Sequence, residues 1–454
     1  MTSSLTLINT LFFTGFSLFF ILLGICSFVE KEIRATWIAL AFLISTTLFW
    51  GFFILNPKML PGLNLVVVSG ISLAGLFSLV RFFPQKTPKR ETSRAIQYDE
   101  RDNMFARNNL QHHPQLMDTY YKLHPENRSC DLQIHNKPEF GDIRQVYHDD
   151  YTAPCYGAAF EYLEKTIPLS DGIVAPPKKQ VDIQKFTTAL LDMIGFYGGC
   201  DVGILPLEPH HFYSHKGRHA RNWGDKTDQT HKTAIVIVVP MRTAMIKQGP
   251  TSTVIQESAQ KYVEAAKISN IAAAYIRQFG FKARAHNDAN YETLCVPLAV
   301  ESGMGELGRM GLFMHKTHGP CVRLAIVTTE MELPASPESP CLHMENFCQI
   351  CKKCADNCPS NSISHGDEPS SRNLRHWSID QEKCFSYWKT IGSDCGVCIS
   401  VCPYTKPNTL VHKLVRIYIS RNIFNQKIAL FMDDLLYGRH KKIPRKNPAR
   451  LFRF

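Results

Sequence analysis

Eight of the fifteen cysteines fall into two linked runs near the end of the chain, and these runs constrain the fold more than any other feature. The first run is Cys348-x2-Cys351-x2-Cys354-x3-Cys358-Pro359, and the second is Cys384-x10-Cys395-x2-Cys398-x3-Cys402-Pro403. Bacterial ferredoxins space their cysteines in this way, and the fourth cysteine, before proline, ligates the neighbouring cluster. The spacing therefore predicts two 4Fe–4S clusters in residues 341–408, in a protein that transfers single electrons.

The ferredoxin pattern also predicts which thiolates share a cluster. One cluster would be held by Cys348, Cys351, Cys354 and Cys402, and the other by Cys358, Cys384, Cys395 and Cys398. The ten residues after Cys384 are an insertion relative to the compact ferredoxin run. Zinc and disulfides are the alternatives, but zinc prefers separate groups of four ligands with two short pairs. Disulfide frameworks belong to small secreted domains.

Three long apolar segments with almost no charge lie in residues 1–83, and they are Leu5–Val29, Thr36–Leu55 and Leu63–Phe83. Because about 20 apolar residues cross the hydrocarbon core of a bilayer, we expect three transmembrane helices. A cleaved signal peptide is not expected, since the first apolar run is long and lacks a basic start. The first arginine is Arg34, so no twin-arginine leader is expected either.

The basic residues beside these segments predict their orientation. The loop after the first segment and the stretch after the third carry Lys31, Arg34, Arg81, Lys86, Lys89, Arg90 and Arg94, whereas the loop after the second carries only Lys58. The positive-inside rule then predicts a multi-pass protein of the cell inner membrane whose large domain faces the cytoplasm. The cytoplasm also keeps thiols reduced for cluster ligation.

The formal net charge of +11 is unevenly distributed, because the end of the chain is basic and has no acidic residue. Its cations are Arg439, Lys441, Lys442, Arg445, Lys446, Arg450 and Arg453. Such a run is compatible with nucleic acid, but anionic headgroups are the nearer partner for a chain tethered to a bilayer. A solvated, frayed tail is the other interpretation.

A polar linker is expected at residues 84–100, followed by a core at 101–340. Ala234–Val239 and Val322–Thr329 have the β-branched composition of buried strands. Thr253–Phe279 is typical of a long helix, with a capping box of Thr253 and Gln256 and a stop at Gly280. Alternating strands and helices predict an α/β core. In residues 409–454, Thr409–Arg421 and Phe424–Leu436 are expected to form amphipathic helices before the basic tail.

A glycine-rich loop matches G-x-G-x-x-G at Gly303, Met304, Gly305, Glu306, Leu307, Gly308 and Arg309. Glu330 lies at a distance that suits the ribose partner of a dinucleotide site. Such a site also needs a long helix after the third glycine, and Gly311 and Gly319-Pro320 interrupt that helix. We therefore expect the glycines to let the backbone approach a large planar cofactor, with a plain turn as the alternative.

Several stretches taken together resemble the reductive dehalogenases, which are corrinoid enzymes that replace a carbon–halogen bond by carbon–hydrogen. The resemblance runs in order from about residue 98 to 440 and includes both cysteine runs. The other matching stretches are Asp99–Arg107, Tyr120–Glu126, Gly199–Gly203, Tyr213–His215, Glu301–Gly311, Gly319–Arg323 and Met432–Gly438.

This resemblance implies a fold, cofactors and a site. The fold would be α/β, a nitroreductase-like corrinoid-binding core with a ferredoxin-like double 4Fe–4S module, preceded here by three transmembrane helices. A Co(I) corrinoid would be fed by two 4Fe–4S clusters, and Gly303–Arg309 would contact it. The catalytic residues implied are Tyr262 as proton donor, Asn290 and Arg323, with Asn287 as the alternative asparagine.

The residue types suit that chemistry independently. A tyrosine has a pKa of about 10, so it carries a proton at neutral pH, and a nearby guanidinium stabilises the phenolate that remains. A core tyrosine and a strand-end surface charge are the structural alternatives for Tyr262 and Arg323.

Two features depart from the family. Its exported members carry a leader and dock on a small three-span membrane protein, whereas this chain has apolar segments of its own, and Glu30 and Glu32 resemble the paired glutamates of that anchor. The charges could equally flank a span without further function. The sequence also lacks Asp-x-His-x-x-Gly, so a base-off cobalamin or related cobamide without a protein ligand is expected.

The partners expected are a small organohalide, the membrane, and membrane quinol or a reduced ferredoxin or flavodoxin as electron donor. We expect no nucleic acid partner, and a homodimer is compatible with the family. Two other functions are alternatives. Epoxyqueuosine reductase, a tRNA-modification enzyme with a similar core, is soluble, uses an aspartate donor and usually carries helical repeats after the clusters. A membrane iron–sulfur electron carrier would leave some 250 residues between spans and clusters unexplained.

Overall fold

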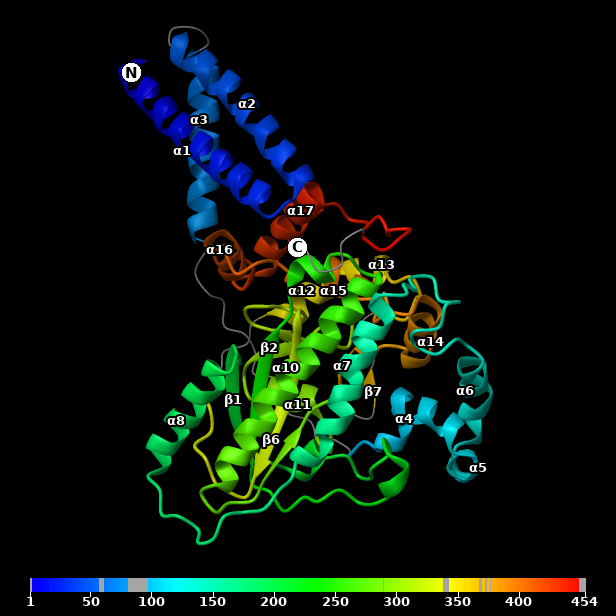
Figure 1. Ribbon diagram of the computed structural model, residues 1–454. Helices are drawn as coiled ribbons and strands as arrows, with labels where there is room; N and C mark the ends of the chain where they lie inside the picture. The colour runs from blue at the N-terminus through cyan, green and yellow to red at the C-terminus, as the bar shows by residue number, and fades with distance from the viewer. Residues whose placement is uncertain are drawn as a thin grey trace. The chain divides into compact units, whose positions relative to one another are not determined.

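The structure is a computed structural model that describes residues 2–56, 61–80, 97–288, 290–337, 343–366, 370–371, 374–375 and 377–448. It divides into two compact units (Figure 1). The first unit comprises Met1–Thr87 and Leu414–Arg439, and the second comprises Pro88–Lys413 and His440–Phe454. Each unit is described separately.

The first unit is helical. It contains α1 (Thr2–Val29), α2 (Ile33–Leu55), α3 (Pro61–Val80), the end of α16 (Leu410–Ile419) and α17 (Ile423–Tyr437). The helices α1 and α2 pack along small residues, because Ala35 and Ala39 are fully buried and a Cβ on Gly24 would lie 3.7 Å from Ala39. The rings of Phe20 and Phe42 stack with centroids 5.3 Å apart.

Two of these helices are long and apolar enough to cross a membrane. They cover Ser4–Val29 and Ile33–Leu55. Of the three expected transmembrane helices, the two near Leu5–Val29 and Thr36–Leu55 therefore have the required length and apolar composition. In the third expected segment the apolar helical stretch among the described residues is the shorter Gly62–Ser72. Residues 81–83 of that segment, and 84–96 of the expected linker, lie outside the described residues.

The second unit is built on a four-stranded sheet with the order β1-β2-β6-β3. The strands are β1 (Asp201–Pro206), β2 (Thr233–Pro240), β3 (Ala283–His286) and β6 (Val322–Thr329). The two strands expected from sequence are therefore confirmed as β2 and β6. All three pairings of this sheet are antiparallel, so helices cover an antiparallel sheet, not the parallel one that alternating strands and helices often form.

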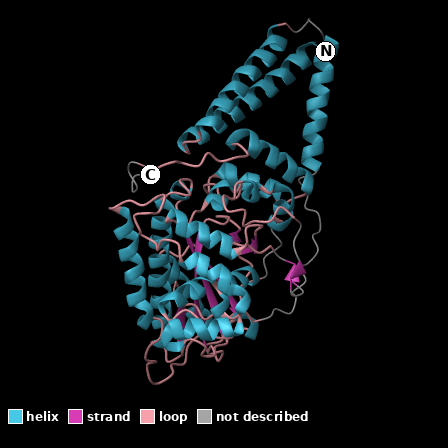
Figure 2. Cartoon of the chain, turned by 90° about the vertical axis from the view of Figure 1, so that its right-hand side faces the viewer, coloured by secondary structure: helices cyan, strands magenta, loops and turns pink. Residues whose placement is uncertain are grey.

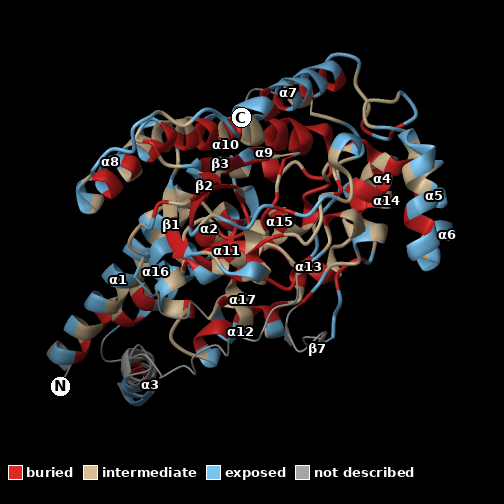
Figure 3. Ribbon diagram, turned by 90° about the horizontal axis from the view of Figure 1, so that it is seen from below, coloured by how far each residue is buried: buried red, intermediate tan, exposed pale blue. Residues whose placement is uncertain are grey.

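Helices pack on both faces of the sheet, and Figure 2 shows strands enclosed among helices. On one face, Ile235 and Ile237 of β2 pack with α8 (Ile183–Phe196) and α10 (Ser252–Arg277). On the other, Val236 and Val238 pack with α11 (Cys295–Glu301). These valines and isoleucines are fully buried, because a strand covered on both sides directs alternate apolar side chains into each layer. Figure 3 shows the burial concentrated along α10 and the strands.

The long helix α10 starts within one residue of its expected position, but the prediction of a capping box formed by Thr253 and Gln256 is wrong. Thr251 is the N-cap and makes no side-chain cap bond. Gln256 instead donates to the backbone oxygen of Thr152 at the start of α7 (Thr152–Thr166). A tertiary contact thus replaces the local one. Gly280, with φ of +86°, follows the helix as expected.

The remaining elements of the second unit surround this core. The helices are α4 (Met104–Asn109), α5 (Pro114–Leu123), α6 (Arg128–His135), α9 (Thr243–Ile246), α12 (Met344–Cys351), α13 (Lys353–Asp356), α14 (Gln381–Ile391) and α15 (Val397–Val401). The short strands are β4 (Gly305–Leu307), β5 (Phe313–His315), β7 (Ser370–Ser371) and β8 (Leu374–Arg375).

The basic tail is packed where it is described. The Lys441 ammonium donates to Ser400 Oγ at 2.7 Å, and the Tyr147 hydroxyl donates to the Pro444 carbonyl at 2.6 Å. Asn447 accepts a bond from the Ser252 amide. The alternative of a frayed tail is therefore wrong for residues 441–447, because these bonds hold the backbone against the unit.

Candidate active site

A cavity of about 600 Å³ lies within the second unit, between α7, α10, β6 and α14. Its apolar walls include Phe105, Phe160, Ile255, Phe313, Phe385 and Trp388. Its polar lining includes Tyr213, Tyr262, Asp288, Tyr291, Arg323 and Asp394. Mostly apolar walls with a few convergent polar groups are typical of a ligand-binding pocket, and the volume lies in the usual range.

The structure brings Tyr262 and Arg323 together in this cavity. Tyr262 projects from α10 and Arg323 from β6, and the guanidinium carbon lies 4.8 Å from the centroid of the tyrosine ring. Burial raises the pKa of Tyr262 above its ordinary value, and the positive charge of Arg323 opposes part of that shift. The phenol therefore keeps its proton at neutral pH and faces a cation that can stabilise the phenolate.

Asp394 fixes the position of Arg323. The guanidinium donates to Ser258 Oγ at 2.5 Å and pairs with the Asp394 carboxylate at 3.3 Å. Asp394 directly precedes the cysteine Cys395, and Ser258 lies one helical turn before Tyr262 on α10. A chain of contacts thus runs from the tyrosine through the arginine to the cysteine module. Sequence reasoning missed Asp394, and its position beside a cysteine was the available signal.

The expected asparagine, Asn290, is not among the described residues that line the cavity. Its amide donates to Ser170 Oγ at 2.7 Å and accepts from Arg284 at 2.9 Å. Asn287 is 1% exposed and donates to Asn270. Asp288, between them, does line the cavity. Two further tyrosines that sequence reasoning missed, Tyr213 and Tyr291, also line it, and burial raises the pKa of both.

The glycine-rich loop packs against its own hairpin. A Cβ on Gly305 would collide with the backbone of Met314, and one on Gly308 would lie 2.4 Å from the Met314 sulfur. These glycines allow β4 to lie close to β5, which explains their presence without a ligand. Among the described residues that line the cavity, none comes from Gly303–Arg309. Their role as corrinoid contacts therefore remains a prediction.

Arg309 connects this loop to the first cysteine run. Its guanidinium is 1% exposed, donates to the carbonyls of Cys348, Ser364 and Gly366, and lies 4.6 Å from the Trp377 ring centroid. A buried guanidinium satisfied in this way connects the glycine-rich loop to Cys348 of α12 and to the backbone at Ser364 and Gly366.

The eight predicted ligand cysteines gather into two neighbouring groups. Electrostatic interactions connect Cys402 with Cys348, Cys351 and Cys354. They also connect Cys398 with Cys358, Cys384 and Cys395. Each group contains the four thiols that the spacing assigns to one cluster. Cys398 also interacts with Cys354, so the two groups are adjacent.

The chemistry of these thiols fits a metal cluster. The fourteen described cysteines are all free, so no disulfide occurs among them. Burial raises the pKa of Cys354, Cys384 and Cys395 to about 12. Several adjacent buried thiols ionise only where a cation compensates their charges, and iron in a cluster supplies that compensation.

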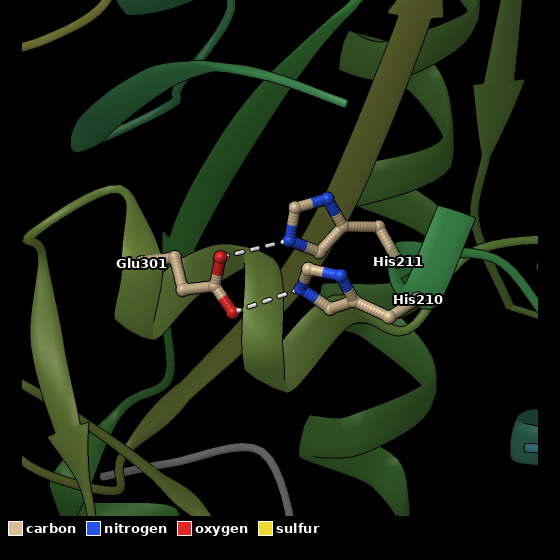
Figure 4. Close-up of side chains that lie close together, drawn as sticks. All are labelled: His210, His211 and Glu301. Atoms are coloured by element: carbon tan, nitrogen blue, oxygen red, sulfur yellow. Dashed lines mark hydrogen bonds and ion pairs between the residues drawn. The ribbon is translucent and has the colours of Figure 1, made fainter. Parts of the chain in front are cut away.

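A second group with ligand-type side chains lies outside the cavity, where His210 and His211 face Glu301 (Figure 4). The backbone N–H of Glu208 donates to His211 Nδ1 at 2.9 Å. Nε2 therefore carries the ring proton and donates to Glu301 at 2.9 Å. A metal would have to displace this proton, so the group is better explained as a hydrogen bond from the buried His211 to the exposed Glu301, which joins η5 (Pro209–His211) to α11.

Another set of polar residues in the resembling stretches forms a buried ion network. Arg107 pairs with Asp131 at 2.7 Å and with Glu382 of α14 at 2.6 Å. The Tyr121 hydroxyl donates to the same Asp131 at 2.9 Å. These contacts hold the N-terminal part of the unit against the helix of the cysteine insertion. Arg107 and Tyr121 come from the stretches that resemble the family, and these contacts give both residues a role in packing.

Comparisons with known proteins found a matching family model and several similar proteins. A family model described as a 4Fe-4S dicluster domain matches residues 347–406. The tetrachloroethene reductive dehalogenase of Sulfurospirillum multivorans is 34% identical over 223 residues, which cover 47% of this chain and 44% of that protein. A tetrachloroethene reductive dehalogenase of Desulfitobacterium hafniense is 34% identical over 199 residues, which cover 41% and 35%. The chain thus spans less than half the length of these curated relatives.

Solved structures share the fold. The catabolic reductive dehalogenase NpRdhA, in complex with 3-bromo-4-hydroxybenzoic acid, superposes with a TM-score of 0.61 at 20% identity, covering 78% of this chain and 49% of that one. Its K488Q variant gives a TM-score of 0.62 at 21% identity, covering 78% and 48%.

The epoxyqueuosine reductase of Lactococcus garvieae is 25% identical over 126 residues, which cover 24% of this chain and 32% of that protein.

Proposed function

We propose that this chain, which belongs to the reductive dehalogenase family, replaces a carbon–halogen bond of a small organohalide by carbon–hydrogen. The observation that carries the proposal is the cavity in which Arg323 lies over Tyr262 and pairs with Asp394, next to a cysteine of the dicluster domain. A proton donor and an electron-transfer module thus meet at one cavity. The reaction needs both, because two electrons and one proton convert the organohalide into its hydrogenated product and a halide ion.

The cysteine groups supply the electrons in this proposal. Cys348, Cys351, Cys354 and Cys402 hold one 4Fe–4S cluster, and Cys358, Cys384, Cys395 and Cys398 hold the other. The interaction between Cys354 and Cys398 favours transfer between the clusters. Cys395 directly follows Asp394, which lines the cavity. We therefore propose that the cluster whose ligands include Cys395 delivers the electrons to the site.

Tyr262 supplies the proton. The phenol gives its hydrogen to the carbon that loses the halide, and Arg323 stabilises the phenolate until a solvent proton restores it. Asp394 keeps the guanidinium over the ring. Because Asn290 is not among the residues that line the cavity and bonds to Ser170 and Arg284, we assign it a supporting role, not contact with the substrate.

A corrinoid fits the remaining requirement. When bound, it supplies the low-potential metal centre that attacks or accepts the halogen. Apolar and aromatic walls such as Phe313, Phe385 and Trp388 suit the faces and edges of a macrocycle. In this proposal the corrinoid is base-off and has no protein ligand, as the family resemblance implies.

The N-terminal helices anchor the enzyme in the cell inner membrane in this proposal, with α3 as a third span and the second unit in the cytoplasm. Basic residues favour that side. Membrane quinol is then the nearest electron donor, and a reduced ferredoxin or flavodoxin is the alternative. A reporter fused after Phe454 should be active only in a cytoplasmic assay, and activity in the periplasm would contradict this orientation.

Anoxic purification of the full chain tests the activity. The protein should contain iron, acid-labile sulfide and cobalt, and the reduced protein should release halide from tetrachloroethene or a halogenated phenol. Cobalt-free protein, or cobalt-containing protein that reduces an epoxyqueuosine-containing tRNA and no organohalide, would contradict the proposal.

A further inference from the structure

The helix α17 has its polarity reversed relative to a surface helix of a soluble protein. Its buried side carries Asn425 and Gln426, each 1% exposed, and Asp433, which is 9% exposed. Its outer side carries Phe424, Ile428 and Phe431, which are 38%, 37% and 66% exposed. The spacings of four and three residues place these apolar side chains on one face. An apolar face turned outward over a polar inner side indicates a non-aqueous neighbour.

The polar side of α17 makes hydrogen bonds inside the first unit, and rotation of the helix about its axis would break them. The Asn425 side chain donates to the Tyr418 carbonyl of α16 at 3.0 Å. Its backbone N–H donates to the Asn422 side chain, which caps the helix. These bonds orient the helix with Phe431 outward.

The preceding helix extends the same apolar surface. Leu414 and Ile417 of α16 are 54% and 41% exposed and lie three residues apart, on one face. In α17 the exposed Lys427 is next to Ile428. Its long side chain can extend from an apolar surface to an anionic headgroup. We call the exposed side chains of Leu414, Ile417, Phe424, Ile428 and Phe431 the outer apolar face.

The position of α17 favours a lipid surface over other neighbours. The helix packs on α2, and its Tyr437 side chain lies within electrostatic range of Glu30 and Glu32 at the turn between α1 and α2. At that turn the first membrane-length apolar helix ends and the second begins. Polar and charged residues at the end of such helices lie at the headgroup level of a bilayer. An amphipathic helix at this level places its apolar face in the boundary between headgroups and acyl chains.

We propose that α17 and the end of α16 lie in the membrane interface, with the outer apolar face inserted among the lipids and Lys427 at the anionic headgroups. This proposal rests on the proposed membrane anchor. It adds a second, interfacial contact made by a segment that follows the cysteine runs by only a few tens of residues in the chain. The second unit, which contains those runs, would then be tethered by the N-terminal helices and also by α17 with the end of α16.

The test uses the full chain in nanodiscs of anionic phospholipid, with photoreactive benzoylphenylalanine substituted for one phenylalanine at a time. Substitution at Phe431 probes the outer apolar face. Substitution at Phe42, which is 41% exposed on α2, reports on the anchor, and substitution at Phe196, which is 83% exposed at the end of α8, serves as a soluble control. Lipid adducts are measured by mass spectrometry after illumination, and unchanged elution of the nanodiscs checks that each variant folds.

We expect lipid adducts at Phe431 to exceed those at Phe196 by at least about ten-fold, as for an inserted side chain. Adducts at Phe42 without adducts at Phe431 would overturn the interfacial proposal and leave the anchor intact. Absence of adducts at both would overturn the anchor as well. A cross-link from Phe431 to a second copy of the chain would show that the face is a protein interface, which also contradicts the proposal.

Discussion

The guanidinium of Arg323 lies over the ring of Tyr262, with 4.8 Å between its central carbon and the ring centroid. The two residues come from β6 and α10, which are 61 positions apart at these points, and their contact places a fixed positive charge beside a protonated phenol. The charge has more effect on the phenolate than on the phenol, so it should lower the barrier to proton transfer.

Replacing the phenol tests its role most directly. Tyr262→Phe removes the donated proton and leaves the ring, so we expect halide release to fall by about 100-fold or more. Iron and cobalt contents should be unchanged. Tyr275→Phe, on the same helix but in the apolar core, is the matched control and should keep full activity. Normal turnover by the Tyr262 variant would remove this residue from the mechanism.

Asp394 is expected to act through Arg323. In Asp394→Asn the neutral amide holds the guanidinium less firmly, and we expect kcat to fall by roughly ten-fold while KM changes little, the size typical of a weakened charged hydrogen bond. Asp394→Glu should restore part of the rate. The control is Asp380→Asn on the same module, where asparagine can replace aspartate as the N-cap of α14. Equal losses in the control would assign Asp394 to folding alone.

The pH dependence should not show titration of Tyr262 near neutrality. Tyrosine is neutral when protonated, and burial raises its pKa above the ordinary value of about 10. The phenol therefore keeps its proton as the pH rises, and the proton is lost only above that raised pKa. Single-turnover dehalogenation by pre-reduced enzyme should be flat from about pH 6 to about pH 9. A basic limb in that range that disappears in Tyr262→Phe would contradict the shift.

Removal of one cluster ligand should affect one cluster. Cys354→Ala is expected to lower the iron content from about eight to about four atoms per chain, and to block enzymatic reduction of the site. Cys321→Ala is the control, since Cys321 is also buried at 1% exposure but lies outside both cysteine groups. Unchanged iron content in the Cys354 variant would refute the ligand assignment.

The buried ion network should matter for stability. Asp131 is fully buried, and Asp131→Asn would leave the Arg107 charge paired only with Glu382. We expect a loss of roughly 3 kcal/mol or more in the free energy of unfolding, because a buried charge loses its main partner. Denaturant titration under anoxic conditions measures this. Asp142→Asn, in a surface pair with Arg144, should leave the midpoint unchanged, and a similar shift in both variants would contradict the network's special role.

Local patterns predicted those parts of the protein that depend on short-range spacing. The strands β2 and β6 followed from β-branched runs, and α10 from its length and periodicity. The grouping of eight cysteines followed from intervals of two and three residues, which reflect the geometry of one loop. The family resemblance, not periodicity, suggested Tyr262 and Arg323.

Contacts between distant segments were beyond such patterns. Arg309 belongs to a glycine motif that suggested a cofactor, yet its partners include the carbonyl of Ser364, 55 positions further on. Asn290 matched a motif but bonds to Ser170, 120 positions earlier. The predicted capping box does not form for the same reason, because the Gln256 side chain donates to a backbone carbonyl of α7 and not to the N-terminus of its own helix. In each case a tertiary partner determined what the side chain does.

The insertion after Cys384 has a consequence for how the electron-transfer module can be exchanged. Ten residues separate Cys384 from Cys395, and they hold most of α14, including Phe385 and Trp388 in the cavity wall, together with Asp394. A compact ferredoxin grafted in its place would keep every cluster ligand and yet remove that wall and the partner of Arg323. In the proposed reaction the length of this loop therefore affects the substrate site, and shortening it should uncouple reduction of the metal centre from delivery of the proton.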